Sequence, residues 1–203
     1  MRYLLIIAVI LFSGCNQTKQ NDQAGNKNAF NKAQKITQKD SIQKVAVLVL
    51  KALKAKDYSR FTSYFHPAEG VRFSPYGFID FTHKQILAKD FLEAIDKHWI
   101  LTWGHFDGSG EAIKLRIKPY IDRYIYNADY LAAEKKDYDS FIGNGNSINN
   151  LKEIYPQLHF TEYYFSGFDQ KYNGLDWSSL RLVFKKYQNN YYLVAVIHDQ
   201  WTA

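Results

Sequence analysis

Apolar residues recur at helical spacing in the first half of the chain. The run DSIQKVAVLVLKALK begins with Asp40 and Gln43 at the spacing of a helix capping box. Its apolar residues then return every three or four positions, which predicts a largely buried helix whose inner face holds Val45, Leu48, Val49 and Ala52. A short helix is predicted next over residues 58–65, and the sequence HPAEG ends it.

Beyond the short helix the pattern changes from extended to helical. The segment VRFSPYGFIDF, residues 71–81, is predicted to be extended. Thr82 and Gln85 then repeat the capping-box spacing and predict a helix over residues 83–99. The apolar face of this helix is formed by Ile86, Leu87, Phe91 and Ile95.

From residue 99 onward the pattern is that of short strands. WILTWGHF and EAIKLRI flank the turn DGSG and predict a β-hairpin over residues 99–117. A turn or helix starts at Pro119, and residues 127–150 are rich in turn residues. Three alternating segments then predict antiparallel strands: HFTEYYF (159–165), SLRLVFKKY (179–187) and YYLVAVIHD (191–199). Helices followed by an antiparallel sheet predict an α+β fold, with the N-terminal helices packed on one face of a mostly antiparallel sheet.

A separate apolar segment lies at the N-terminus, before the only cysteine of the chain. After Arg2, residues 3–12 carry no charge, and two small residues precede Cys15. The run is too short to cross a bilayer, which needs roughly 20 apolar residues, and residues 1–14 have the layout of a secretory signal peptide. The segment resembles a bacterial lipoprotein signal, which implies cleavage before Cys15 and a diacylglyceryl-type lipid on its thiol. The alternative is a buried cysteine in an N-terminal helix, for which the segment offers no further support.

A polar segment separates this signal from the rest of the chain. Residues 15–40, rich in Asn, Gln and Lys, predict a disordered tether ahead of one domain over residues 41–203. Within residues 16–39, five lysines against Asp22 give +4, and the mature chain carries +5 because the signal peptide removes only Arg2 from the total of +6. The folded domain is therefore close to neutral, which argues against nucleic acid as a partner. The expected location is the cell envelope, on the periplasmic or cell-surface side of a membrane.

The order of the predicted elements resembles the nuclear-transport-factor-two-like family, also described as the cystatin-like cone. The resemblance covers residues 41–203 and rests on two adjoining helices, the segment GVRFSPYG, a third helix and a long antiparallel meander. GVRFSPYGFID, WGHFDGSGE and SLRLVFKKYQNNYYLVAVIHDQWTA are also similar to segments of uncharacterised secreted bacterial lipoproteins. The family implies a curved sheet against helices, with a pocket that is catalytic in some members and a binding or assembly surface in many. No catalytic motif of the family maps onto this chain, and a fold alone does not give a function.

Motifs for cofactors and for known catalytic centres do not occur in the sequence. The chain has no GxSxG, HExxH or P-loop, and FIGNGN lacks the Lys and Ser/Thr of a phosphate loop. His198 and Asp199 are adjacent in a predicted strand, so their side chains point to opposite faces and cannot readily share a metal ion. His83 and His98 lie at opposite ends of one predicted helix, about 22 Å apart at a rise of about 1.5 Å per residue. Neither a metal nor any other cofactor is therefore predicted.

The C-terminal hairpin carries the most specific candidate site. A two-residue turn at Asn189–Asn190 would place Arg181 opposite His198 on one face of the sheet. The guanidinium would keep the imidazole neutral, and the pair could receive an anionic ligand or supply a general base beside an electrostatic clamp. A sheet-edge arginine beside a hydrogen-bonded histidine is the plainer interpretation. A three-residue loop over residues 188–190 would instead pair Arg181 with Ile197.

Further polar and aromatic side chains are candidates for ligand contact. Tyr192, Glu162, His105 and Asp80 all lie in or beside predicted strands. Aromatic residues make up 17% of the chain, with 16 Tyr and 4 Trp, and Tyr and Trp can stack on sugars, although core packing explains most of them. Two functions follow as hypotheses. The first is a non-catalytic module that binds a small ligand, a glycan or an envelope protein. The second is an enzyme for hydration or isomerisation, with His198 as base and Arg181 as anion clamp.

Overall fold

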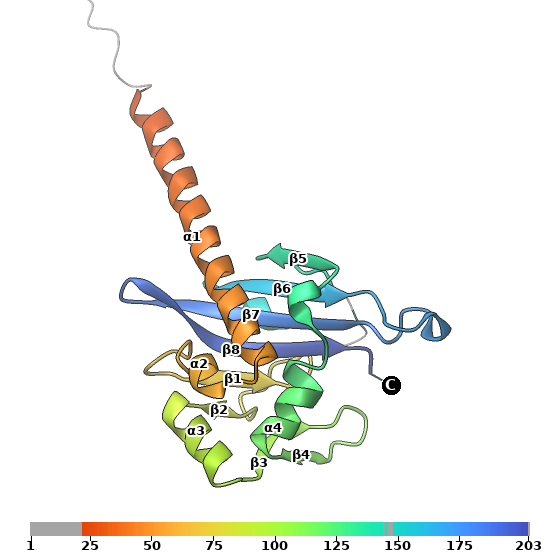
Figure 1. Ribbon diagram of the computed structural model, residues 1–203. Coiled ribbons are helices and arrows are strands. Elements are labelled where there is room, and N and C mark those ends of the chain that lie inside the picture. Colours follow the sequence, from red (N-terminus) through yellow and green to blue (C-terminus); the bar gives the residue numbers. More distant parts are fainter. Residues whose placement is uncertain (1–21, 144, 146–147, 203) are drawn as a thin grey trace, which may run out of the picture. The chain divides into compact units, whose positions relative to one another are not determined.

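A computed structural model describes residues 22–143, 145 and 148–202, with side chains described from residue 37 onward. The chain divides into two units, Met1–Thr37 and Gln38–Ala203. The predicted signal peptide and Cys15 lie outside the described residues. Helix α1 (Asp22–Lys54) contributes its N-terminal part to the first unit, and the second unit holds its C-terminal part and the other described elements (Figure 1).

Helix α1 begins at Asp22, well before the predicted capping box. Asp40 and Gln43 therefore lie inside the helix, and the prediction that the helix starts at Asp40 is wrong. The physical reason is composition: residues 22–39 consist mainly of Ala, Lys, Gln and Asn, and the first three are good helix formers. Once the buried face beyond Ser41 forms a helix, little opposes its extension toward the N-terminus. The role of this segment as a spacer stays a prediction.

The remaining helices are short. Ordinary helices are α2 (Tyr58–Thr62), α3 (Ala88–Asp96), α4 (Ile117–Tyr120) and α5 (Leu151–Ile154). A π-helical turn, η1 (Ile121–Ile125), continues α4, and two 3₁₀ turns are η2 (Tyr130–Ala132) and η3 (Gln170–Tyr172). Asp57 begins α2 as its N-cap, because its carboxylate accepts a hydrogen bond from the backbone N–H of Arg60 at 2.9 Å.

The described residues form eight strands in two sheets. They are β1 (Val71–Ser74), β2 (Gln85–Ile86), β3 (Leu101–His105), β4 (Ala112–Leu115), β5 (Lys135–Tyr138), β6 (His159–Phe165), β7 (Ser178–Tyr187) and β8 (Asn190–Gln200). The larger sheet has the order β2-β1-β8-β7-β6-β5, while β3 and β4 form a separate hairpin. Strand β1 runs parallel to β8, and the other pairings are antiparallel. The predicted α+β class with a mostly antiparallel sheet is confirmed.

The third predicted helix is shorter than its pattern indicates. Gln85 belongs to β2, and α3 begins only at Ala88. Thr82 does not cap a helix; its backbone N–H and its hydroxyl both donate to Oδ1 of Asp80, each at 2.7 Å. Strand β1 offers an unpaired edge to residues 85–86, and this long-range pairing overrides the local helical pattern.

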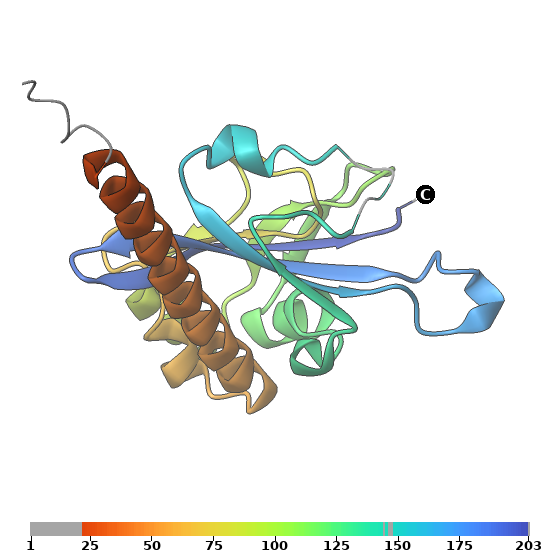
Figure 2. The ribbon, with the colours of Figure 1, turned by 90° about the horizontal axis from the view of Figure 1, so that it is seen from above.

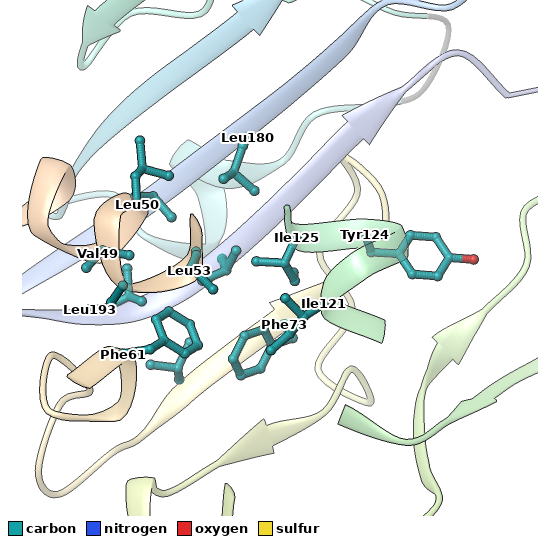
Figure 3. Close-up of a cluster of buried hydrophobic side chains, with 14 of the residues drawn as sticks. Val49, Leu50, Leu53, Phe61, Phe73, Ile121, Tyr124, Ile125, Leu180 and Leu193 are labelled. Atoms are coloured by element: carbon teal, nitrogen blue, oxygen red, sulfur yellow. The ribbon is translucent and has the colours of Figure 1, made fainter. Parts of the chain in front are cut away.

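The main hydrophobic core lies between one face of the large sheet and the helices. Figure 2 shows the C-terminal part of α1 crossing the sheet, and Figure 3 shows Leu50 and Leu53 of this helix near Leu180 and Leu193 of the sheet. A cluster of buried aromatic rings extends this core toward β3, and it consists of Phe61, Phe65, Phe73, Phe91, Trp103, Tyr120 and Tyr124. The opposite face of the sheet has a smaller core around Phe160, Val183 and Ile197. Both faces of the central strands are therefore buried.

Candidate functional site

The β7–β8 register differs from the register predicted for the C-terminal hairpin. The turn lies at Gln188–Asn189, because Tyr187 pairs with Asn190, and Gln188 has φ +53°. A β-bulge between Val183 and Phe184 then shifts the pairing by one residue. Arg181 consequently opposes Ile197, and Leu180 opposes His198.

Arg181 and His198 therefore point to opposite faces of the sheet, and the prediction that they sit side by side is wrong. The turn begins one residue earlier than predicted because Gln188 adopts a left-handed conformation. Asparagine adopts this conformation more readily than glutamine, so the sequence favoured a turn at Asn189–Asn190. Both side chains are fully buried. A base and an anion clamp must face the same reacting molecule, so this pair does not form an acid–base centre.

Arg181 belongs instead to a buried ion-pair cluster. Its guanidinium contacts Oε1 of Glu162 through Nη2 at 3.0 Å and Oδ2 of Asp199 through Nη1 at 3.0 Å. Nη2 also donates to the carbonyl of Gly143 at 3.1 Å. Glu162 in turn accepts hydrogen bonds from the backbone N–H groups of Ile142 and Gly143 and from the hydroxyl of Ser179. The cluster thus fixes the segment 141–143 onto the sheet.

His198 takes part in a second buried network, on the helix side of the sheet. Its Nδ1 donates to the carbonyl of Pro75 at 3.2 Å, so Nε2 is the acceptor and faces Ser178 Oγ at 3.2 Å and Asn127 Nδ2 at 3.3 Å. Burial lowers the pKa of His198 to about 4, with a smaller contribution in the same direction from Arg181. The direction of this change agrees with the predicted neutral imidazole, and its main cause is burial and not Arg181.

The other ligand-binding candidates from the sequence are dispersed. Glu162 is fully buried in the ion-pair cluster. Tyr192 pairs with Lys185 and packs its ring near His66 and Tyr187, close to the hairpin turn. The structure does not bring Tyr192 together with the buried cluster.

His105 and Asp80, by contrast, share a pocket. This pocket has a volume of about 520 Å³, within the range of ligand sites in proteins. It lies between the segment that follows β1 and the β3–β4 hairpin, and we call it the β1–β3 pocket. Its wall is formed by Tyr76, Phe78, Asp80, His83, His105, Phe106, Asp107 and Ile148. Three aromatic rings thus stand beside two carboxylates and two imidazoles.

The segment 75–80, which forms one wall of this pocket, is held by buried polar contacts. His198 bonds the carbonyl of Pro75, and the Ser74 hydroxyl lies 2.8 and 2.9 Å from the carbonyl oxygens of Tyr76 and Phe78. The side-chain amide of Asn150 bonds both the N–H and the carbonyl of Ile79, at 2.8 and 3.0 Å. A backbone fixed at so many points presents its side chains in one arrangement, as a preorganised binding site requires.

Close contacts at two glycines also shape the pocket. A Cβ atom at Gly77 would lie 2.7 Å from Oδ2 of Asp199, and one at Gly104 would lie 2.8 Å from Cδ2 of His83. Both distances are too short for a side chain. Gly77 therefore lets the wall approach β8, and Gly104 lets β3 approach the His83 ring.

The tautomer of His83 follows from its neighbours. Its Nδ1 lies 3.2 Å from the backbone N–H of Asp80, which can only donate, so Nδ1 is the acceptor and the proton resides on Nε2. Ser74 Oγ contacts the same nitrogen at 3.0 Å. Burial lowers the pKa of His83 to about 4, against a smaller opposing effect of Asp80. At neutral pH His83 is therefore an uncharged Nε2–H donor, and this N–H has no hydrogen-bond partner among the described residues.

Asp80 is the fixed acceptor of the pocket. Its Oδ1 accepts the two hydrogen bonds from Thr82, which lower the pKa of the carboxyl group. Asp107, at the tip of the hairpin, accepts a hydrogen bond from the backbone N–H of Gly108 at 3.2 Å. Two carboxylates beside neutral His83 disfavour an anionic ligand and favour one that donates hydrogen bonds.

Sequence reasoning named Asp80 and His105 but not the rest of this pocket. His83 was considered only as a metal ligand at the end of a helix, and it lies instead between β1 and β2. The sequence signal that could have indicated this pocket is the high density of aromatic and polar residues in SPYGFIDFTH, residues 74–83. What the sequence did not indicate is that this segment meets the tip of the β3–β4 hairpin, since that hairpin does not join the large sheet.

Metal coordination has no candidate in the described part of the chain. No group of three or more His, Cys, Asp or Glu residues there is placed to hold a metal ion. The helices within the described ranges include none that is both long enough and apolar enough to traverse a bilayer. The chain matches no protein-family model, no curated protein and no solved structure in the comparisons made.

Proposed function

We propose that this protein is a lipid-anchored binding module of the bacterial cell envelope, whose domain is a cystatin-like cone. The anchor rests on the sequence of residues 1–15 alone. Support for the cone comes from the element order and from α1 packing on one face of a mostly antiparallel sheet. In this proposal Cys15 carries the lipid, and residues 16–40 separate it from the domain.

The β1–β3 pocket is proposed to bind a neutral, hydroxyl-rich ligand such as a glycan. The observation that carries this proposal is the combination of exposed aromatic faces, Phe78 being 46% exposed, with the acceptor Asp80 and the uncharged donor His83. Sugar rings pack their C–H faces on aromatic rings and offer hydroxyls that both donate and accept. A carboxylate acceptor and an N–H donor on one wall match that chemistry.

Catalysis by Arg181 and His198 is not part of the proposal. The two residues lie on opposite faces of the sheet, and neither lines the β1–β3 pocket. His83 does line the pocket, but its proton resides on Nε2 and its Nδ1 is occupied, so it donates a hydrogen bond and does not act as a base.

Calorimetric titration with neutral oligosaccharides tests this function. The panel includes cellotriose, maltotriose and tri-N-acetylchitotriose. Phe78→Ala and Asp107→Asn should each weaken binding by about tenfold, which corresponds to about 1.4 kcal/mol. Phe81→Ala and Glu111→Gln are matched controls, because both side chains are exposed, lie close by in the sequence and do not line the pocket. Equal losses in the variants and the controls would contradict the assignment, as would the absence of binding to any oligosaccharide.

A further inference from the structure

A second cavity lies between α3 and the segment that joins β4 to α4. Its volume is about 310 Å³, and it shares no lining residue with the β1–β3 pocket. Figure 1 shows α3 and α4 at the same end of the domain as the β3–β4 hairpin. The wall is formed by Ala94, Ile95, His98, Arg116, Ile117, Lys118 and Pro119. We call this site the α3–α4 cavity.

The charged side chains that line the cavity are all cationic. Arg116, Lys118 and His98 supply its polar side chains, and no Asp or Glu is among the lining residues. The guanidinium of Arg116 has no hydrogen bond or ion pair to any described residue. Lys118 has no ion pair within the described ranges either, and its ammonium lies 5.9 Å from the centre of the Tyr58 ring. Two of the residues that line this cavity, Arg116 and Lys118, thus carry permanent positive charges without an ion pair to any described residue.

Glu93, Asp96 and Asp122 are the acidic residues close along the chain to these charges, and none of them lines the cavity. Glu93 of α3 is already paired with Lys97, at 2.5 Å. Asp122, beyond α4, is paired with Lys56 at 2.8 Å. These pairs lie outside the lining of the cavity. An external anion is therefore the natural counter-ion for Arg116 and Lys118.

His98 reaches the cavity through an unfavourable backbone conformation. It has φ +55°, a left-handed value that an L-residue adopts at an energetic cost and that glycine adopts freely at the end of a helix. The backbone N–H of His98 bonds the carbonyl of Ile95, and that of Trp99 bonds the carbonyl of Ala94, so the turn itself is a normal helix ending. Glycine would adopt this backbone conformation at a lower energetic cost than histidine. The presence of histidine therefore suggests that its imidazole N–H has a function, such as binding a ligand.

The remaining wall of the cavity is apolar. Ala94 and Ile117 are buried, and with Ile95 and Pro119 they form the aliphatic part of the lining, which we call the aliphatic floor. An inorganic anion would leave this floor in contact with water. A ligand with an anionic head and a short hydrocarbon chain would cover it and gain the hydrophobic free energy of each buried methylene, about 0.8 kcal/mol.

We infer that the α3–α4 cavity is a binding site for an anionic amphiphile, meaning a single carboxylate or phosphate head joined to an alkyl chain. Arg116 and Lys118 bind the head, His98 donates a third hydrogen bond, and the aliphatic floor receives the first methylene groups. The same chemistry is offered by a free fatty acid or alkyl phosphate and by the head region of an anionic membrane lipid. The inference stands apart from the proposed glycan site, because the two cavities have no residue in common.

Titration of the full-length Cys15→Ser protein with octyl phosphate, below its micelle concentration, tests the inference. Inorganic phosphate and octyl glucoside are the reference ligands, because one lacks the chain and the other lacks the charge. Octyl phosphate should bind at least about tenfold more tightly than either reference ligand. Arg116→Gln and Lys118→Gln should each weaken binding of octyl phosphate by about tenfold.

Two control variants distinguish binding at the cavity from non-specific attraction of the ligand to surface charges. Lys114→Gln removes an exposed lysine of β4 that does not line the cavity, and binding should be unchanged. His98→Gly should stabilise the protein, because glycine relieves the positive φ, and should still weaken binding. Equal affinity for inorganic phosphate and octyl phosphate would overturn the inference, and so would equal losses in Lys114→Gln and Arg116→Gln.

Vesicles distinguish the two sources of the ligand. The same protein is sedimented with phosphatidylglycerol vesicles and with phosphatidylcholine vesicles. Binding of octyl phosphate together with Arg116-dependent sedimentation on phosphatidylglycerol identifies a membrane lipid as ligand. Binding of octyl phosphate without sedimentation identifies a free amphiphile. Sedimentation without binding of octyl phosphate would overturn the cavity site.

Discussion

Arg181 and Glu162 face each other directly across β7 and β6, and their fully buried side chains form an ion pair in which Nη2 lies 3.0 Å from Oε1. Removing one partner leaves an uncompensated buried charge, which destabilises proteins by about 3–5 kcal/mol. Arg181→Met should therefore lower the free energy of unfolding by at least about 3 kcal/mol. Urea denaturation followed by circular dichroism measures this change.

A surface ion pair provides the control for this prediction. Lys97 and Glu93 form an i,i+4 pair with exposed groups. Lys97→Ala should leave the free energy of unfolding nearly unchanged, because exposed ion pairs contribute little to stability. Similar losses of unfolding free energy for Lys97→Ala and Arg181→Met would show that the buried cluster contributes no more to stability than a surface ion pair.

The second prediction concerns stability between pH 4 and pH 7. Burial lowers the pKa of His198 and of His83 to about 4, whereas histidine in an unfolded chain titrates near about 6.5. Below about pH 6.5 the unfolded chain binds protons that the folded protein does not bind. The stability that both residues contribute is therefore complete above about pH 6.5 and is lost as the pH falls toward 4, at about 1.4 kcal/mol per pH unit for each histidine.

A non-titrating variant isolates the contribution of one histidine. His198→Asn should reduce the slope of unfolding free energy against pH by about 1.4 kcal/mol per pH unit in this window, whatever its effect at pH 7. Denaturant midpoints measured at half-unit pH steps give the slope. An unchanged slope would mean that folding does not lower the pKa of His198.

The third prediction concerns Gly77. A methyl group there would lie 2.7 Å from the Asp199 carboxylate and would force the pocket wall away from β8. Gly77→Ala should lower the free energy of unfolding by roughly 1–3 kcal/mol through overpacking. Gly110→Ala is the comparison, since its Cβ would meet nothing within 4 Å and only its positive φ of +69° would be strained. A smaller loss at Gly77 than at Gly110 would contradict the close approach of the wall and β8.

The fourth prediction concerns the N-terminal anchor. Cys15→Ser removes the thiol to which the lipid would be attached, so the protein should move from the membrane fraction to the soluble fraction after cell breakage. Fractionation followed by immunoblotting measures the distribution. Metabolic labelling with an alkyne-bearing fatty acid should also label the native chain and not the variant. Continued membrane retention of an unlabelled Cys15→Ser chain would contradict the lipid anchor.

Much of the fold could be predicted because its pattern is local. The alternating segments around Phe160, Leu182 and Val196 are strands, and the face of α1 that holds Val49 is buried as its spacing indicates. Leu48 was predicted on the same buried face and is 36% exposed. The pairing of residues 85–86 with β1 could not be foreseen, because that partner is remote and the local pattern is helical.

The candidate site was harder to predict because it depends on register and on contacts between distant loops. Moving the turn from Asn189–Asn190 to Gln188–Asn189, together with one bulge, changes the partner of Arg181 from His198 to Ile197. A shift of one residue moves every side chain to the other face of the sheet. Asp80 and His105 were named from the sequence as polar residues near strands, but only the folded chain shows that they line one pocket.

Mapping of amide chemical shifts by NMR, with the tightest-binding oligosaccharide of the panel, tests the central proposal most directly. Shift changes on addition of the oligosaccharide should concentrate on residues 76–83 and 105–107, which contain most of the lining of the β1–β3 pocket, and Phe78→Ala should suppress them. Residues 116–119 of the α3–α4 cavity should be unaffected. Shifts confined to other surfaces, or saturable binding that leaves residues 76–83 unchanged, would contradict the proposal that this pocket is the ligand site.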